Sequence, residues 1–313
     1  MKRLFPFCWL VLAILSCSIF SAPASIPNST VIVNPAEPLA TATAGITPTV
    51  PALTADQLKN SLYQLVVKDS HPTVQLVNGV YQNGTDSFSP DYISVNLVEP
   101  IAFGDLNGDG VSDAAVLIAE NYGGTGVFVS VVAMLNKGGQ PVEAASGLID
   151  DRPTINSISI KDGQIYLDAT VHGPNDPGCC AVQPTMRTYR YEADQLVITG
   201  WSMTMPDHQE RAITIDSPVD GAQVSWPLTV TGHFTVAPFE NTLAYSVYDK
   251  DHSQVAVGPL MVNAQQPGGP GTFSLTLDLS GKNVAGPLQI QVEDTSAADG
   301  SILALASVSI NLK

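Results

Sequence analysis

Basic residues are scarce in this 313-residue chain. Lys and Arg together number 13 against 29 Asp and Glu, which gives a formal net charge of −16 at pH 7. Since no block of Lys and Arg reverses this charge locally, such a surface repels nucleic acid and anionic lipid headgroups. The composition therefore argues against a nucleic-acid partner. It suits solubility and the binding of divalent cations.

Cysteine is scarce too. Two of the four cysteines lie within the first 17 residues, and the other two, Cys179 and Cys180, are neighbours. Because thiols outside the cytoplasm tend to oxidise, we expect this pair to form a vicinal disulfide with a structural role. The alternative is a metal site with His172 and Asp176, for which one nearby histidine makes an incomplete ligand set.

Recognisable catalytic motifs are missing. The five histidines stand in no nucleophile or metallohydrolase motif such as GxSxG or HExxH. The glycine-rich stretch 120–126 lacks the ending of a phosphate-binding loop and is interpreted as a hairpin turn. The sequence therefore predicts a protein that is not an enzyme. A pair of glycosidase carboxylates stays open, because their pairing is spatial.

The one long apolar run lies at the N-terminus. Lys2 and Arg3 precede an uncharged run of 14 residues over 7–20, and small residues follow. This order is typical of a signal peptide, and the run is shorter than the roughly 20 residues of a membrane-spanning anchor. We therefore expect residues 1–22 to be a signal peptide and the protein to be extracytoplasmic, either secreted or anchored to the bacterial cell surface.

Two processing routes fit this segment. Residues 14–17, Ile-Leu-Ser-Cys, resemble the lipobox of bacterial lipoproteins, which implies lipidation of Cys17 and a membrane contact through that lipid alone. Ordinary cleavage after Ala22 or Ala24 is the alternative. Residues 23–53 are rich in Pro, Thr and Ala, a composition that predicts an extended linker.

Residues 54–203 are predicted to form an α+β domain that begins with a helix. Thr54 and Gln57 can form a capping box, and leucines recur at helical spacing, so a helix is expected over 54–67.

The rest of this domain is predicted to be an antiparallel sheet. The dense apolar run 127–132 fits a strand that is buried on both faces. Turn signals at 162–163 and 193–194 separate alternating segments, a pattern that favours sequential hairpins over parallel units.

The sequence 105–113, Asp-Leu-Asn-Gly-Asp-Gly-Val-Ser-Asp, carries the strongest local signal. Oxygen-bearing side chains fall at loop positions 1, 3, 5 and 9, and position 7 offers a backbone carbonyl, which together suit calcium. The loop resembles the DxNxDGxxD calcium loops of dockerin and integrin-type repeats. We predict a structural calcium site; the alternative is an Asp- and Gly-rich turn without metal. The expected ligands are Asp105, Asn107, Asp109, Val111 (through its carbonyl) and Asp113.

After a polar linker at 204–212, about seven short strands at even spacing over 213–313 predict a β-sandwich. The motifs Ser217-Pro218, Trp226-Pro227-Leu228 and Val230-Thr231-Gly232 follow in order, and the acidic stretch 293–300 closes the series. Residues 213–313 thereby resemble Gmad2, the immunoglobulin-like domain of bacterial spore germination proteins. The resemblance implies an envelope module without catalytic residues, and it does not imply sporulation. The 172–180 segment with the 105–110 loop loosely resembles an uncharacterised bacterial exported domain.

The fold is thus predicted to be mainly β, with an α+β domain of one helix on an antiparallel sheet followed by an immunoglobulin-like sandwich. We expect a non-catalytic exported envelope protein, a binding or structural module whose partner is an unknown envelope protein or glycan. One alternative is an extracellular hydrolase of wall or polymer substrates, with the sandwich as accessory domain and a cleft in 54–203 that holds two convergent acids or a His–nucleophile pair. Another is a solute-sensing lipoprotein of a germination-like pathway.

Overall fold

A computed structural model describes residues 50–313 except 69, 175 and 283. The expected signal peptide, Cys17 and the linker up to residue 49 lie outside the described residues. The described residues form one compact unit. Within the described part of this unit, no helix has the length and apolar character that crossing a membrane requires.

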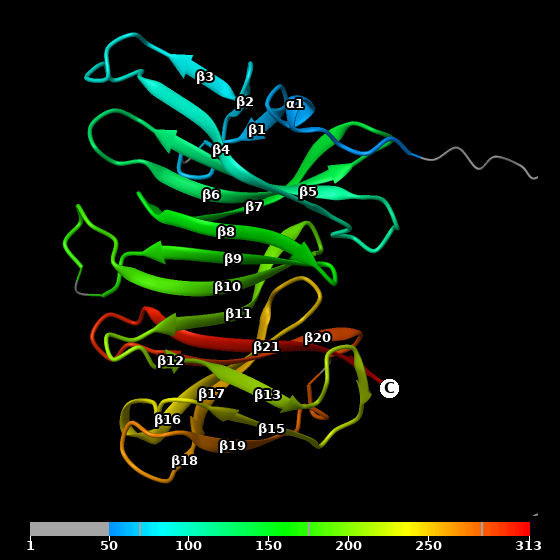
Figure 1. Cartoon of the computed structure of the whole chain (residues 1–313). Coiled ribbons are helices and arrows are strands. Elements are labelled where there is room, and N and C mark those ends of the chain that lie inside the picture. The colour runs from blue at the N-terminus through cyan, green and yellow to red at the C-terminus, as the bar shows by residue number, and fades with distance from the viewer. Residues whose placement is uncertain (1–49, 69, 175, 283) are drawn as a thin grey trace, which may run out of the picture. The chain divides into compact units, whose positions relative to one another are not determined.

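The elements up to residue 204 are mostly strands (Figure 1). They are α1 (Ala55–Leu58), β1 (Leu62–Gln64), β2 (Thr73–Gln75), β3 (Val80–Asn83), β4 (Ile93–Gly104), β5 (Asp113–Asn121), β6 (Phe128–Asn136), β7 (Pro141–Asp151), β8 (Thr154–Lys161), β9 (Gln164–Val171), β10 (Gln183–Glu192) and β11 (Gln195–Thr204).

The elements from residue 210 onward are strands and one 3-10 turn. They are β12 (Glu210–Arg211), β13 (Ile213–Ser217), β14 (Ala222–Val224), β15 (Leu228–Phe234), η1 (Phe239–Asn241), β16 (Thr242–Tyr248), β17 (Gln254–Met261), β18 (Asn263–Ala264), β19 (Gly271–Leu277), β20 (Pro287–Thr295) and β21 (Ile302–Leu312).

The predicted length of the first helix, 54–67, is wrong. The capping box is present, but α1 ends at Leu58 after four residues. Leu62 is then 56% exposed, whereas Tyr63 and Leu65 are buried. This period of two suits a strand, and β1 pairs with β2. Strand pairing therefore overrides the helical spacing of the leucines.

Besides the small β1–β2 sheet, two larger antiparallel sheets form the N-terminal half. One contains β3, β4, β5, β6 and β7 in that order, and β8 to β11 lie in a second. β5 and β6 are buried along nearly their whole length because both faces of this sheet are covered. Leu117 and Val131 pack against the β8–β11 side, whereas Val116 and Val132 pack with α1, β1 and β2. The prediction of a doubly buried strand is confirmed.

Tight turns connect the predicted hairpins. Asp162 and Gly163 join β8 to β9 with φ values of 50° and 73°. Ala193 and Asp194 join β10 to β11 with φ values of 47° and 60°. Positive φ at both central residues matches the right-handed twist of the strands, which is why such two-residue turns close hairpins.

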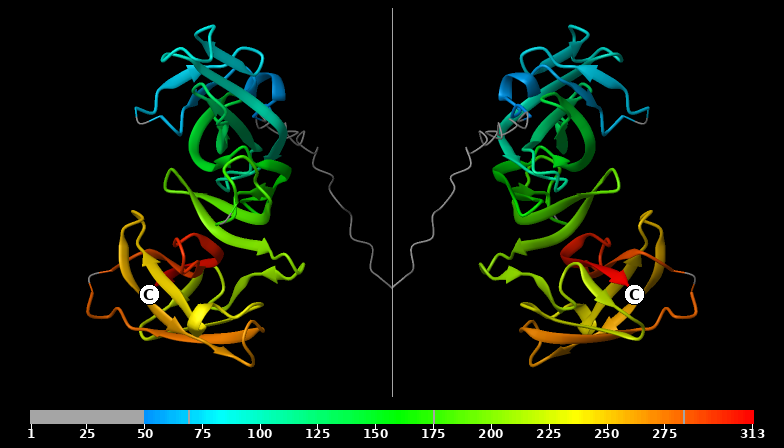
Figure 2. Two further views of the ribbon diagram at one scale, coloured as in Figure 1. Left: turned by 90° about the vertical axis from the view of Figure 1, so that its left-hand side faces the viewer. Right: turned by 90° about the vertical axis from the view of Figure 1, so that its right-hand side faces the viewer.

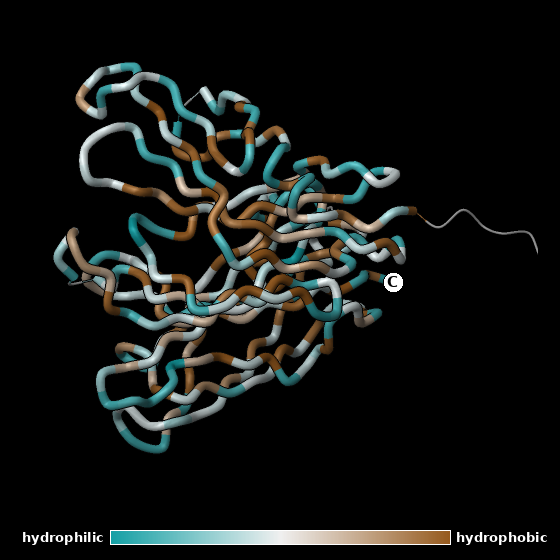
Figure 3. Tube along the Cα trace, turned by 45° about the horizontal axis from the view of Figure 1, so that its top comes forward, coloured by the Kyte–Doolittle hydropathy of each residue, from teal (hydrophilic) through white to brown (hydrophobic). Residues whose placement is uncertain are grey.

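The C-terminal half is a β-sandwich (Figure 2). One sheet has the order β13-β15-β19-β18, and the other side is formed by β17, β16, β20 and β21. Aliphatic and aromatic side chains from both sides form its core. Figure 3 shows hydrophobic residues along the strands and mostly hydrophilic residues in the turns at their ends. The predicted mainly β fold is confirmed.

The two halves share one sheet. β11 pairs with β21, with Gly200 opposite Ala306 and Trp201 opposite Leu305, so β8–β11 continue into the sandwich as part of a 10-stranded sheet. The segment 204–212, expected to be a linker, contains β12, which pairs with the end of β11. Backbone hydrogen bonds therefore connect the N-terminal half to the sandwich.

Candidate functional site

The predicted calcium loop connects β4 to β5. Gly108 and Gly110 have φ values of 76° and 80°, a backbone conformation that glycine adopts without strain. Between them and β4, Leu106 is buried in the core between the two N-terminal sheets. The loop is thus fixed at its base and exposed at its tip.

Three carboxylates organise the backbone of this loop. Asp105 accepts N–H groups from three residues of the tip at 2.7–3.2 Å. Asp109 accepts the side-chain amide of Asn107 at 3.0 Å and the N–H of Val111 at 2.8 Å, and these bonds hold the pKa of Asp109 below its usual range. Asn107 and Asp109 therefore lie at the exposed tip, whereas Asp105 is half-buried at the base of the loop.

Asp113 is fully buried at the start of β5. Its two oxygens accept the N–H groups of Leu106 at 2.9 Å and Asn136 at 2.8 Å. Burial raises the pKa of Asp113, and the charges of Asp109 and Asp105 act in the same direction. A cation in this loop would relieve that repulsion.

The donor set of the loop fits calcium, which takes oxygen ligands from carboxylates, amides and backbone carbonyls. Asp113 already holds two backbone N–H groups, so its share in a coordination sphere is limited to the remaining lone pairs. In the described part of the chain, no group of three or more His, Cys, Asp and Glu is arranged to hold a metal ion. Calcium therefore stays a prediction.

The second predicted site is the loop between β9 and β10. Cys179 and Cys180 form a disulfide at its exposed end. At its base, Asp176 accepts the N–H groups of Gly173 at 2.8 Å and Val182 at 3.1 Å, which lowers the pKa of Asp176. The carboxylate considered as a metal ligand therefore closes the loop instead.

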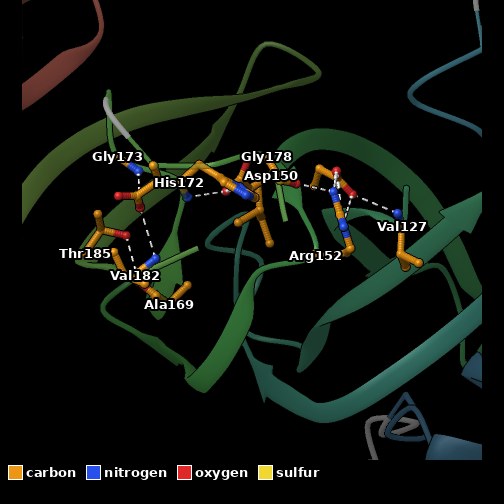
Figure 4. A network of polar contacts seen from close by, with 12 residues as sticks. Val127, Asp150, Arg152, Ala169, His172, Gly173, Gly178, Val182 and Thr185 are labelled. Atoms are coloured by element: carbon orange, nitrogen blue, oxygen red, sulfur yellow. Dashed lines mark hydrogen bonds and ion pairs between the residues drawn. The ribbon is translucent and has the colours of Figure 1, made fainter. Parts of the chain in front are cut away.

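Two acidic residues at the end of β7 tie this loop to the sheet (Figure 4). Asp150 accepts both the backbone N–H of His172 at 2.5 Å and its Nδ1–H at 2.9 Å. Arg152 binds Asp151 through two nitrogens, which lowers the pKa of Asp151, and reaches the carbonyl of Gly178. The two hydrogen bonds to Asp150 hold the ring of His172 in one orientation.

No motif marks Arg187 or Trp201 as site residues, yet the structure brings them to His172. Arg187 on β10 is 3% exposed, and its guanidinium carbon lies 3.8 Å from the ring centroid of Trp201 on β11. The three side chains line a cavity of about 240 Å³. The sequence holds one signal for Arg187: the two-residue period of a strand places it on the same face of β10 as the buried Thr185 and Tyr189.

A larger cavity, of about 630 Å³, lies beside β1 and β7. Its lining includes His71, Glu143 and Asp194. Burial raises the pKa of Glu143, whose carboxylate accepts the N–H of Gln64 at 2.7 Å. His71 places its Nδ1 3.0 Å from the carbonyl oxygen of Leu65. This cavity is where the hydrolase alternative would have to find its acids.

Residues 212–301 match the model of the Gmad2 family, described as the immunoglobulin-like domain of bacterial spore germination. The C-terminal sandwich is therefore an immunoglobulin-like domain of this family, which confirms the resemblance noted in the sequence. Curated proteins gave no match to the chain. Among solved structures, the chain is similar to the extracellular domain of a protein described as a one-component system of B. thetaiotaomicron. That similarity covers 67% of this chain and 36% of that chain, at 10% identity and a TM-score of 0.22.

Proposed function

We propose that this chain is a non-catalytic protein of the bacterial cell envelope that acts outside the cytoplasm as a binding or structural module. The observation that carries the proposal is the Gmad2 match over 212–301, a domain described from bacterial spore germination. The export signal expected at 1–22 and the net charge of −16 support a position outside the cytoplasm and away from nucleic acid. The partner is an envelope protein or a glycan.

The shared sheet supports this role. Because β11 pairs with β21, a partner that binds the sandwich also constrains the N-terminal half. Arg190 strengthens the junction, with one nitrogen 2.8 Å from the hydroxyl of Ser309 and another 2.9 Å from the carboxylate of Asp220. Two halves joined in this way suit a rigid module that presents a surface at a fixed angle.

The proposal includes calcium as a structural ion of the 105–113 loop. Asp105, Asn107, Asp109 and the carbonyl of Val111 would coordinate the ion. Asp113 would complete the ligand set with its remaining lone pairs. The charge of the ion would offset the repulsion among the carboxylates. The bound ion would then stiffen the connection between β4 and the doubly buried strand β5.

The hydrolase alternative is the second candidate, because one observation favours it. Glu143 lines the larger cavity, and burial raises its pKa, as is typical of a general acid. The hydrogen bond from the N–H of Gln64 favours a structural role, since it connects β1 to β7. We therefore prefer the non-catalytic function.

Incubation of the purified chain with cell-wall sacculi and with soluble wall glycans separates the two functions. Co-sedimentation measures binding, and the release of reducing ends measures hydrolysis. We expect retention on the sacculi without release. Release that persists in Lys161→Gln, a change at the exposed end of β8, but disappears in Glu143→Gln would establish the hydrolase instead. The absence of both retention and release would contradict a wall-binding role.

A further inference from the structure

The cavity of about 240 Å³ lies where the N-terminal half meets the sandwich. Its walls come from Ile149 and Asp150 on β7, from the end of β9 and the loop after it, from β10 and β11, and from the start of β21. Pockets for drug-sized molecules usually measure about 300–1,000 Å³, so this one suits a ligand of a few heavy atoms. Its chemistry is set by the buried Arg187 and by two half-buried side chains, His172 and Trp201.

Arg187 places an uncompensated positive charge in this wall. It is 3% exposed, and no carboxylate of the described residues lies within ion-pair distance of it. Nη1 donates to the carbonyl of Ile149 at 3.0 Å. The ring of Trp201 offsets only part of the desolvation of a guanidinium. Asp150 also lines the cavity, but its carboxylate is bound to His172, so the guanidinium of Arg187 is left to receive an anion.

The free edge of the guanidinium selects the shape of that anion. Nε is buried and has no hydrogen-bond partner among the described residues, and Nη2 donates to none of them either. These neighbouring nitrogens form a fork whose two parallel N–H groups match a carboxylate. The indole Nε1 of Trp201, a donor only, is also buried without a partner in the described chain. A carboxylate thus meets donors from two residues.

His172 adds a group of the opposite kind. The carboxylate of Asp150 can only accept, so Nδ1 of His172 carries a proton. In the neutral ring Nε2 is then an acceptor, and this atom is buried with no partner in the described residues. An acceptor beside an anion site is suited to a hydroxyl group that belongs to the same ligand.

We propose that the cavity formed by His172, Arg187 and Trp201 binds a small hydroxycarboxylic acid. Its carboxylate lies on the free fork of Arg187 and the indole N–H of Trp201, and its hydroxyl donates to Nε2 of His172. The ligand compensates the buried charge and contacts both halves through the walls of the cavity. This site goes beyond the proposed envelope function and does not depend on it.

Calorimetric titration of the purified chain with lactate, acetate, phosphate and sulfate tests this proposal. We expect lactate to bind about fivefold to tenfold more tightly than acetate, the gain of one hydrogen bond. Arg187→Gln should weaken lactate binding by about a hundredfold or more, because the bidentate pair is lost. Trp201→Phe, which keeps an aromatic ring but loses the indole N–H donor, should weaken the binding of lactate and acetate alike. His172→Asn, whose amide can still donate to Asp150, should abolish the preference for lactate.

Lys161→Gln is the matched control, since it removes one positive charge from the exposed end of β8 and should leave binding unchanged. If Arg187→Gln does not fold, Trp201→Phe and His172→Asn carry the test by themselves. The proposal is overturned if lactate does not bind, or if phosphate or sulfate binds more tightly. It is equally overturned if lactate affinity is the same in the folded variants.

Discussion

Removing the charge of Arg211 should destabilise the protein severely. Arg211 lies on β12, and its Nε is 2.7 Å from Oδ2 of Asp294 on β20, a carboxylate that is 3% exposed. Burial raises the pKa of Asp294, and Arg211 acts in the opposite direction. Arg211→Met therefore leaves a buried carboxylate without its counterion.

The expected cost is about 3–5 kcal/mol, as for other buried pairs that lose one partner. For a chain of this size, about 2–4 °C of melting temperature correspond to each kcal/mol, so the midpoint should fall by about 6–20 °C. The double variant Arg211→Met with Asp294→Leu should recover most of this loss, because no buried charge remains.

The deficit of Arg211→Met should also depend on pH. Because the folded pKa of Asp294 is raised, the stabilisation that comes with its protonation is fully present below the unfolded pKa. It is lost as the pH rises through the folded pKa. The gap between Arg211→Met and the wild type should therefore narrow as the pH falls from about 7 to about 5.

Urea denaturation followed by tryptophan fluorescence measures these differences. Lys250→Met is the control, because the Lys250–Asp251 pair is exposed, and it should change stability by less than about 0.5 kcal/mol. The reasoning is refuted if Arg211→Met stays within about 1 kcal/mol of wild type, well below the cost of an unpaired buried charge. It is also refuted if the double variant is no more stable than the single one.

Three further predictions concern the loop, the sandwich core and the cysteines. After chelation, calcium at about ten times its dissociation constant should stabilise the protein by about 1.4 kcal/mol, a rise of about 3–6 °C in calorimetry, and Asp109→Asn should reduce the effect. Gly232→Ala should cost about 1–3 kcal/mol in urea, since its Cβ would lie 2.1 Å from a carbonyl oxygen, whereas Gly147→Ala meets no atom within 4 Å and should be neutral. Thiol titration of the denatured mature chain should find Cys179 and Cys180 oxidised; two free thiols there would contradict the disulfide.

Local chemistry made much of the fold predictable. The hairpin turns at 162–163 and 193–194 depend on neighbouring residues alone, and the doubly buried run near 127–132 is visible in its composition. The helix over 54–67 was overpredicted because the pairing of β1 with β2, which competes with it, involves residues further along the chain. The pairing of β11 with β21 lies beyond any local pattern, since about a hundred residues separate these strands.

The candidate sites divide in the same way. The 105–113 loop was visible because its expected ligands are contiguous in sequence. The cavity at His172, Arg187 and Trp201 is not visible, because β7, the end of β9 with its following loop, β10, β11 and the start of β21 converge on it. The 172–180 segment stands out in the sequence, but its environment is not predictable from it: Asp176 closes the loop, while Asp150 orients His172.

The central claim is that this protein acts outside the cytoplasm. Its cellular location and intact mass in a bacterial host test this claim most directly. We predict that fractionation and mass spectrometry recover the chain from the envelope or the medium. Its mass should correspond to a start at a lipidated Cys17, or after Ala22 or Ala24. Recovery from the cytoplasm, with residues 1–22 still present, would contradict the account of an extracytoplasmic envelope protein.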